Sequence, residues 1–199
     1  ATCSGASRQL ALIGGVNSVP IISASSTSPT LSESYPYFKR TCPSDSFATT
    51  GITHVLKNLL GYTRVASMAD TSEYATDMAT NFAEVARAQS IEIECTISYS
   101  FVVGTSTSTD LVGVAGQLEA CGVQVRRWGT APVPSVRHSH GAARCMTLPT
   151  TSPVSLVGRQ VVILFTQTGT AAPLLRAAWD RGLRAGYVWI GNDGVNEDA

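Results

Sequence analysis

The sequence predicts an α/β protein whose mostly parallel sheet is covered by helices on both faces. Short runs rich in β-branched residues alternate with longer runs in which apolar residues recur at helical spacing. Strict alternation of strand and helix is typical of parallel sheets, because parallel strands need a crossover between them. The expected strands are 19–23, 64–69, 91–100, 161–166 and 187–190, and the expected helices are 7–15, 47–60, 74–89, 110–120 and 171–181.

The composition excludes several classes of partner. Of the 199 residues, 44% are hydrophobic and 14% are charged, which is enough apolar surface for a real core. The 14 basic residues balance the 14 acidic ones, so no long-range field recruits nucleic acid or an anionic membrane. No apolar run approaches the roughly 20 residues of a membrane-spanning helix. The chain opens on Ala1 without a signal peptide, so we expect an internal fragment.

The cysteines do not suggest a metal or redox centre. There is no C-x-x-C pair, which argues against a zinc ribbon and a thioredoxin-like site. Because the number of cysteines is odd, at least one of them has no disulfide partner within the chain. The spacing alone does not define which cysteines pair. They lie at positions 3, 42, 95, 121 and 145.

Polar residues follow the predicted strands. Ligands of parallel sheets bind beyond the carboxyl ends of the strands, so function is sought there. The hydroxyl-rich stretch 23–28 follows the first strand and offers side chains and backbone N–H groups that can wrap an anion, and Pro29 ends its regular backbone. A solvated turn is the alternative for this stretch. The other polar strand ends are 70–74, 166–170 and 192–194.

Residues 125–160 break the pattern. This stretch has no periodicity, and it carries four prolines and two of the three histidines. Loops of that length without secondary structure are uncommon inside compact domains, so this stretch does not fit the alternating strand and helix pattern. The stretch begins with Val125, whose codons start with GT, and ends with Gln160, one of whose codons is CAG. These are the usual first and last bases of an intron, so we hypothesise a translated retained intron. The alternative is a genuine surface insertion. Mature transcripts that all contain this stretch would rule out the intron.

The order of motifs around the hydroxyl-rich stretch resembles a known family. Cys3-Ser4 precedes the first helix, Ser28-Pro29 closes the serine-rich turn, and 35–41 (YPYFKRT) and 43–45 (PSD) follow. This order resembles the receptor family ligand-binding region. It is the periplasmic-binding-protein-like "Venus flytrap" domain of class C G-protein-coupled receptors, natriuretic-peptide receptors and bacterial amino-acid-binding proteins. The pattern is most similar to that of metabotropic GABA type B receptors.

The resemblance implies a bilobed fold of the periplasmic-binding-protein type I kind, present here only as a fragment. Residues 1–47 would form part of lobe 1, and 48–199 would form lobe 2, with 125–160 as its insertion. In the family, a cysteine placed like Cys3 is bonded to one further upstream.

The resemblance also implies a ligand site on lobe 1. Ser4 matches a serine that holds the α-carboxylate of the ligand, and Ser26 and Thr27 match hydroxyls offered to it. Asp45 matches an acid that receives the amino group in glutamate receptors of the family. Ser4 as a helix N-cap, and Asp45 as the N-cap of the next helix, are the structural alternatives. Gly5 departs from the second serine that is usual in the family.

Lobe 2 is expected to add two more residues. Tyr74 matches an aromatic side chain that lies against the ligand and offers a π-face to an ammonium group. Asp193 matches an acid that binds the amino group. A core tyrosine and an Asp-Gly turn are the structural alternatives. Thr166 stands where GABA receptors carry a tyrosine, and Val195 replaces a common tryptophan.

The function implied by the resemblance is that of the extracellular part of a plasma-membrane receptor. It would bind a small amino-acid-like ligand by cleft closure and work as a dimer, attached to the membrane through a segment absent here. We expect no cofactor and no catalysis, because the sequence has no dinucleotide fingerprint, Walker loop or nucleophile elbow. His138-Ser139-His140 lacks a third metal ligand. The alternatives are the sensor of a receptor guanylate cyclase, a transporter's solute-binding protein and, least favoured, a Rossmann-like enzyme.

Overall fold

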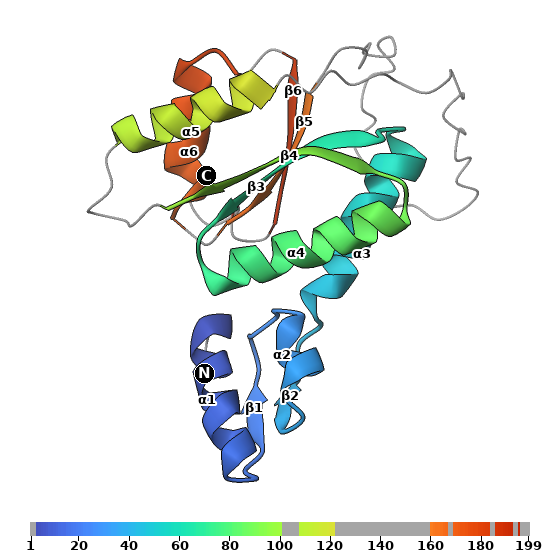
Figure 1. Ribbon diagram of the computed structural model, residues 1–199, viewed down its shortest axis with the longest axis vertical. Helices are drawn as coiled ribbons and strands as arrows, with labels where there is room; N and C mark the ends of the chain where they lie inside the picture. The colour runs from blue at the N-terminus through green and yellow to red at the C-terminus, as the bar shows by residue number, and fades with distance from the viewer. Residues whose placement is uncertain are drawn as a thin grey trace, which may run out of the picture.

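The computed structural model contains two parallel sheets flanked by helices (Figure 1), which confirms the predicted α/β class. A two-stranded sheet has the order β1-β2, and a four-stranded sheet has the order β4-β3-β5-β6. Every strand pair is parallel. The structure describes residues 3–100, 108–121, 160–166, 169–183, 186–192 and 195. The predicted insertion therefore lies outside the described residues except for Gln160.

The N-terminal unit, residues 3–44, holds the small sheet. It comprises α1 (Ser4–Val16), β1 (Ile21–Ser23), α2 (Thr30–Ser34) and β2 (Phe38–Arg40). Its core is small and consists of Ala11, Leu31 and Phe38.

Gly14 lets α1 lie close to β1. A Cβ at this position would lie 2.6 Å from the Ile21 side chain and 2.7 Å from the Val19 carbonyl oxygen. No real Cβ tolerates such contacts, so a side chain at position 14 would push the helix away from the strand.

The C-terminal unit begins at residue 45 and holds the larger sheet. Helices α3 and α4 lie on one face of this sheet, and α5 and α6 lie on the other (Figure 1). Its elements are α3 (Asp45–His54), the π-helical turn η1 (Val55–Leu59), β3 (Arg64–Asp70), α4 (Glu73–Ala88), β4 (Glu92–Tyr99), α5 (Ser108–Cys121), β5 (Gln160–Phe165), α6 (Ala171–Asp180) and β6 (Tyr187–Gly191).

The central strands β3 and β5 supply most of the core. Val65 to Asp70 and Val161 to Phe165 are buried without interruption, as expected for strands covered on both faces. Phe82 of α4 packs on Phe165 of β5 with ring centroids 5.4 Å apart, which joins the helix layer to the sheet.

Two elements of the N-terminal unit differ from the sequence expectation. Pro29 does more than end the loop, because it lies at the N-cap of α2 with a φ of −56°. The proline ring fixes this helical φ, so the chain turns directly into a helix. β2 follows a few residues later and pairs with β1 from Phe38 to Arg40.

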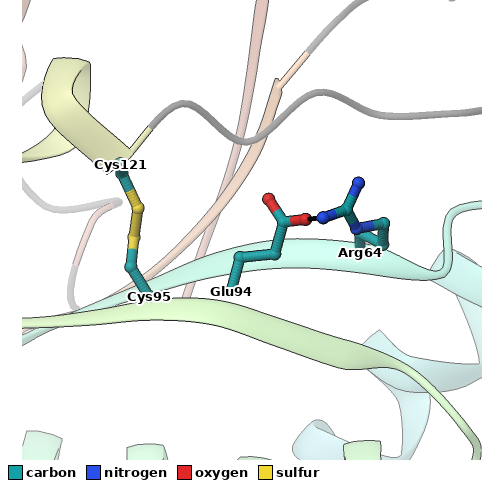
Figure 2. Close-up of a disulfide and its surroundings, with 4 residues drawn as sticks. All are labelled: Arg64, Glu94, Cys95 and Cys121. Carbon is teal, nitrogen blue, oxygen red and sulfur yellow. Dashed lines mark ion pairs between the residues drawn. A yellow bond between two sulfur atoms is a disulfide. The ribbon is translucent and has the colours of Figure 1, made fainter.

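A disulfide joins Cys95 of β4 to Cys121 at the end of α5 (Figure 2). It fastens the edge strand to the helix that covers one face of the sheet. Close by, the Arg64 guanidinium pairs with the Glu94 carboxylate of the neighbouring strand. Among the described cysteines, Cys3 and Cys42 are free thiols.

Candidate functional site

A narrow cleft separates the N-terminal unit from helix α4 of the C-terminal unit. The cleft is closed in this structure, because the space between its lining side chains does not admit a water molecule. Seven of its eight lining side chains are polar or charged. They are Ser4, Arg8, Ser28, Thr30, Leu31 and Tyr35 from the N-terminal unit, and Glu73 and Asp77 from α4.

Two contacts cross this cleft. The Ser28 hydroxyl donates a hydrogen bond to Asp77 Oδ2. The Arg8 guanidinium lies 3.5 Å from Glu73 Oε1. Its Nε also donates to the Tyr35 hydroxyl over 3.2 Å. This hydrogen bond, with the smaller effect of Glu73, raises the pKa of Arg8 above its ordinary value. Each contact places a carboxylate of α4 on a donor of the N-terminal unit.

Ser4 lies at the first turn of α1 and lines the cleft. Its hydroxyl accepts a hydrogen bond of 3.2 Å from the Ser28 backbone N–H, so helix start and loop are joined. The N-cap of α1 is Cys3, whose side chain makes no capping bond. Ser4 is therefore not an N-cap, and the positive end of the helix dipole points toward the cleft.

Ser26 is buried behind the cleft wall. Its hydroxyl lies 2.7 Å from the Ser7 hydroxyl and accepts from the Ser23 hydroxyl over 2.9 Å. Arg40 braces the same loop, because its guanidinium donates to the Ser26 carbonyl over 3.1 Å and to the Ser28 carbonyl over 2.8 Å. The hydroxyl-rich stretch is thus held in a fixed shape by its own side chains together with those of Ser7 and Arg40.

Thr27 and Asp45 are joined through the backbone. The Asp45 N–H donates to the Thr27 carbonyl over 2.9 Å, so the loop is tied to the start of α3. Ser44 is the N-cap of α3, and its hydroxyl accepts from the Ser46 N–H. Asp45 is instead the first residue of the helix and is buried. The N-cap alternative for Asp45 is wrong.

The carboxyl ends of three strands of the larger sheet meet in a buried polar cluster. Asp70 ends β3, Tyr99 ends β4, and Thr166 follows β5. Asp70 Oδ2 accepts from the Thr166 hydroxyl over 3.1 Å and from the Thr170 hydroxyl over 3.3 Å. Its Oδ1 accepts from the Ser72 N–H over 2.8 Å. A charged acceptor with several donors is strongly held, so this cluster fixes the ends of the strands.

Tyr99 completes the cluster. Its hydroxyl donates to the Thr166 hydroxyl over 3.1 Å. Burial raises the pKa of the Tyr99 hydroxyl, and its hydrogen bonds to Thr166 and Thr170 oppose this rise. The phenol therefore stays neutral beyond the pH at which an exposed tyrosine ionises.

Tyr74 is connected to the end of β6 through Asn192. The Asn192 amide donates to the Tyr74 hydroxyl over 3.1 Å and to the Thr166 carbonyl over 2.9 Å. Its oxygen accepts from the Thr166 N–H over 3.3 Å, so the Asn192 side chain bonds the backbone directly after β5. Asp193, the next residue, lies outside the described residues, so its proposed role stays a prediction.

The structure brings together only part of the predicted site. Ser4 lines the cleft, whereas Ser26, Thr27 and Asp45 support the loop beside it. Sequence reasoning missed the charged residues that line the cleft, namely Arg8, Glu73 and Asp77, and gave no individual role to Ser28, Asn192 or Tyr99. The polar strand ends could have indicated Asn192, but no local pattern marks Arg8 or Asp77, which lie within helices.

The parallel sheets flanked by helices are consistent with a fragment of a periplasmic-binding-protein-like fold. The family described as "Receptor family ligand binding region" matches residues 1–125, more than half of the chain, and the chain belongs to this family. Its members are ligand-binding regions of receptors, usually the extracellular domains of membrane receptors. No curated protein matches the chain. In the described part of the chain, no helix is both long and apolar enough to cross a membrane.

The family match ends at residue 125, where the aperiodic segment begins. The hypothesis of a translated intron stays a prediction, as does the lobe boundary at residue 47.

Proposed function

We propose that the chain is the extracellular sensor of a class C G-protein-coupled receptor, similar to the metabotropic GABA type B group, and that it binds a small amino-acid-like ligand between its two units. The observation that carries this proposal is the cleft itself. The start of α1, with Ser4, faces acidic side chains of α4 across it. Family membership supports the class of function, and the polar cleft supports a ligand site between the two units.

The ligand's carboxylate would bind at the start of α1. Free N–H groups and the positive end of the helix dipole favour an anion there, and the hydroxyls of Ser4, Ser26 and Thr27 are the family's donors in this region. The ligand's amino group would bind the carboxylates of Asp45 and Asp193. It would also lie against the ring face of Tyr74. Ser26 is buried and its hydroxyl already bonds those of Ser7 and Ser23, so it must exchange a partner to bind the ligand.

Signalling would follow from closure. Contacts that a ligand makes only when both units touch it shift the equilibrium between open and closed forms toward the closed form. In a plasma-membrane receptor that works as a dimer, this shift would pass to the output domain.

A receptor guanylate cyclase and a solute-binding protein of an amino-acid transporter are the alternatives within the family. They share this fold and differ in the domain or signal to which it is attached. A seven-helix region, a cyclase domain or a lipoprotein signal in the full-length gene distinguishes the three. An enzyme on a Rossmann-like sheet is the least favoured alternative, and turnover of a bound ligand would support it.

Thermal melting against a panel of α-amino acids and GABA tests the proposal. A ligand at 100 times its Kd stabilises the folded state by about 2.7 kcal/mol, which raises the Tm of a domain of this size by about 5–10 °C. We expect one α-amino acid to do so, and we expect Thr27→Ala and Asp193→Ala to abolish the rise. Ser34→Ala, which changes an exposed hydroxyl of α2, is the matched control. A cooperative melt that no ligand shifts contradicts the proposal.

A further inference from the structure

We propose that a groove between α4 and the edge strand β4 is a second binding site, which takes a small uncharged molecule with an alcohol or amide group on an apolar body. The groove has a volume of about 270 Å³, equal to about nine liquid water molecules at roughly 30 Å³ each. Five hydroxyl residues, three alanines and one isoleucine line it. The site lies wholly within the C-terminal unit, apart from the cleft between the units, so it does not depend on the proposed function.

Short side chains on both walls leave the groove unfilled. A stripe of threonine and alanine between positions 76 and 83 of α4 forms one wall. Ser67 of β3 pairs in register with Thr96 of β4, and Ala69 pairs with Ser98, so these four short side chains share one face of the sheet. Thr96 and Ser98 are exposed, so the groove opens to solvent along the edge strand.

The Ser67 hydroxyl lies at the floor of the groove. The residue is only 2% exposed, and among the described residues its Oγ has no hydrogen-bond partner. A buried hydroxyl without a partner costs free energy, and few are found in native proteins. Because Ser67 lines an open groove, a molecule that enters the groove can supply the missing hydrogen bond.

The lining of the groove determines the class of ligand. None of the described side chains that line it is charged, so an ion would lose its hydration there without a counter-charge. The Thr80 hydroxyl already donates to the Thr76 carbonyl over 2.8 Å and can only accept from a ligand, which must therefore carry a donor. The three alanines and Ile93 suit a hydrocarbon body. An alcohol or a primary amide on a compact apolar ring meets these requirements.

The first arm of the test needs no ligand. Ser67→Ala removes the unpartnered hydroxyl, so we expect the urea midpoint of the chain to rise. Ser7→Ala is the matched control, since it removes a buried hydroxyl that is bonded to Ser26, and it should lower the midpoint. A midpoint that does not rise in Ser67→Ala shows that the hydroxyl is satisfied in the folded chain and overturns the proposal.

The second arm measures binding of four probes to the whole chain by saturation-transfer NMR. The probes share one ring: cyclohexanol and cyclohexanecarboxamide are uncharged, whereas cyclohexanecarboxylate and cyclohexylammonium are charged. We expect Ala79→Leu, which fills the groove, to abolish binding of the uncharged probes. Ala88→Leu, the same exchange at an exposed position of α4, should bind them as the wild type does.

Ser67→Ala should weaken binding of the uncharged probes about tenfold, because it removes a buried hydrogen bond to the ligand. The charged probes should show no binding that Ala79→Leu removes. The proposal is overturned if neither uncharged probe binds, if their binding survives Ala79→Leu, or if Ser67→Ala binds them with wild-type affinity. None of these outcomes bears on amino-acid binding at the cleft between the units.

Discussion

The side-chain amide of Asn192 donates a hydrogen bond of 3.1 Å to the hydroxyl of Tyr74, although 118 residues separate them in the sequence. The same amide makes two hydrogen bonds to the Thr166 backbone: its nitrogen donates to the carbonyl, and its oxygen accepts from the N–H. The start of α4 is therefore attached to the ends of β5 and β6. This attachment sets the position of Tyr74, the aromatic residue that we propose lies against the ligand.

Asn192→Ala should lower the free energy of unfolding by about 1–3 kcal/mol, because it leaves buried backbone groups of Thr166 without their partner. Urea unfolding measures this loss. Asn17→Ala is the matched control, since the Asn17 amide is exposed and donates to the Ile13 carbonyl of its own helix. Equal and small losses in the two variants would show that the hydrogen bonds of Asn192 do not contribute to the stability of the fold.

Tyr99 predicts a loss of stability at alkaline pH. Burial raises the pKa of its hydroxyl above the ordinary value of about 10, so above that pH the unfolded chain releases a proton that the folded chain keeps. The folded state then binds more protons, and the free energy of unfolding falls as pH rises. Below about pH 10 the contribution is constant.

Unfolding free energies measured from neutral to strongly alkaline pH check this. Tyr99→Phe should be less stable at neutral pH, because it loses the hydrogen bond to Thr166, and should show a shallower alkaline decline. Tyr187→Phe is a useful comparison, since burial also raises the pKa of Tyr187. Parallel curves for the wild type and Tyr99→Phe would contradict the prediction.

Removal of the disulfide should destabilise the C-terminal unit. Cys95 and Cys121 are separated by 26 residues in the sequence, and closing a loop of that size is worth about 3.5 kcal/mol in the chain-entropy account. Thermal melting of Cys95→Ala/Cys121→Ala should therefore show a lower Tm. In Cys3→Ser, which alters an exposed free thiol, the Tm should stay at the wild-type value. A wild-type Tm that is insensitive to reductant would contradict this prediction.

Exposed apolar side chains on the N-terminal unit and at the start of α3 should make the isolated chain self-associate. Val16 is 81% exposed, and large exposed apolar surfaces drive association. Light scattering should show mass that rises with concentration, and Ile13→Lys/Val16→Lys should reduce it. A monodisperse monomer with a sharp melt would contradict the prediction. The exposed apolar residues of this region are Leu10, Leu12, Ile13, Val16, Val19, Ile22, Tyr37 and Phe47.

The sequence predicted the elements that have long, uninterrupted patterns. β5 was expected at 161–166 and is found at Gln160–Phe165, because a continuous apolar run marks a strand buried on both faces. β2 was missed, since three residues that include Lys39 and Arg40 show no alternation. The helix expected at 47–60 begins instead at Asp45 and changes to a π-helical turn at Val55.

The cleft was predictable only in part. Polarity after the strands pointed to 23–28, and Ser28 does line the cleft. Arg8 and Asp77 lie in the middle of two helices, where a charged residue is the normal pattern for a solvated face. Arg8 of α1 meets Glu73 of α4, and Asp77 of α4 meets Ser28 of the loop before α2, only because the two units lie against each other. The partner of Cys95 likewise depends on how α5 lies on the sheet.

Isothermal titration of the α-amino acid that most raises the Tm tests the central claim most directly. We predict one binding site per chain, with the heat lost in Thr27→Ala and in Asp193→Ala and retained in Ser34→Ala. No heat with any member of the panel, or heat that survives both substitutions, would contradict an amino-acid sensor that closes on its ligand at this cleft.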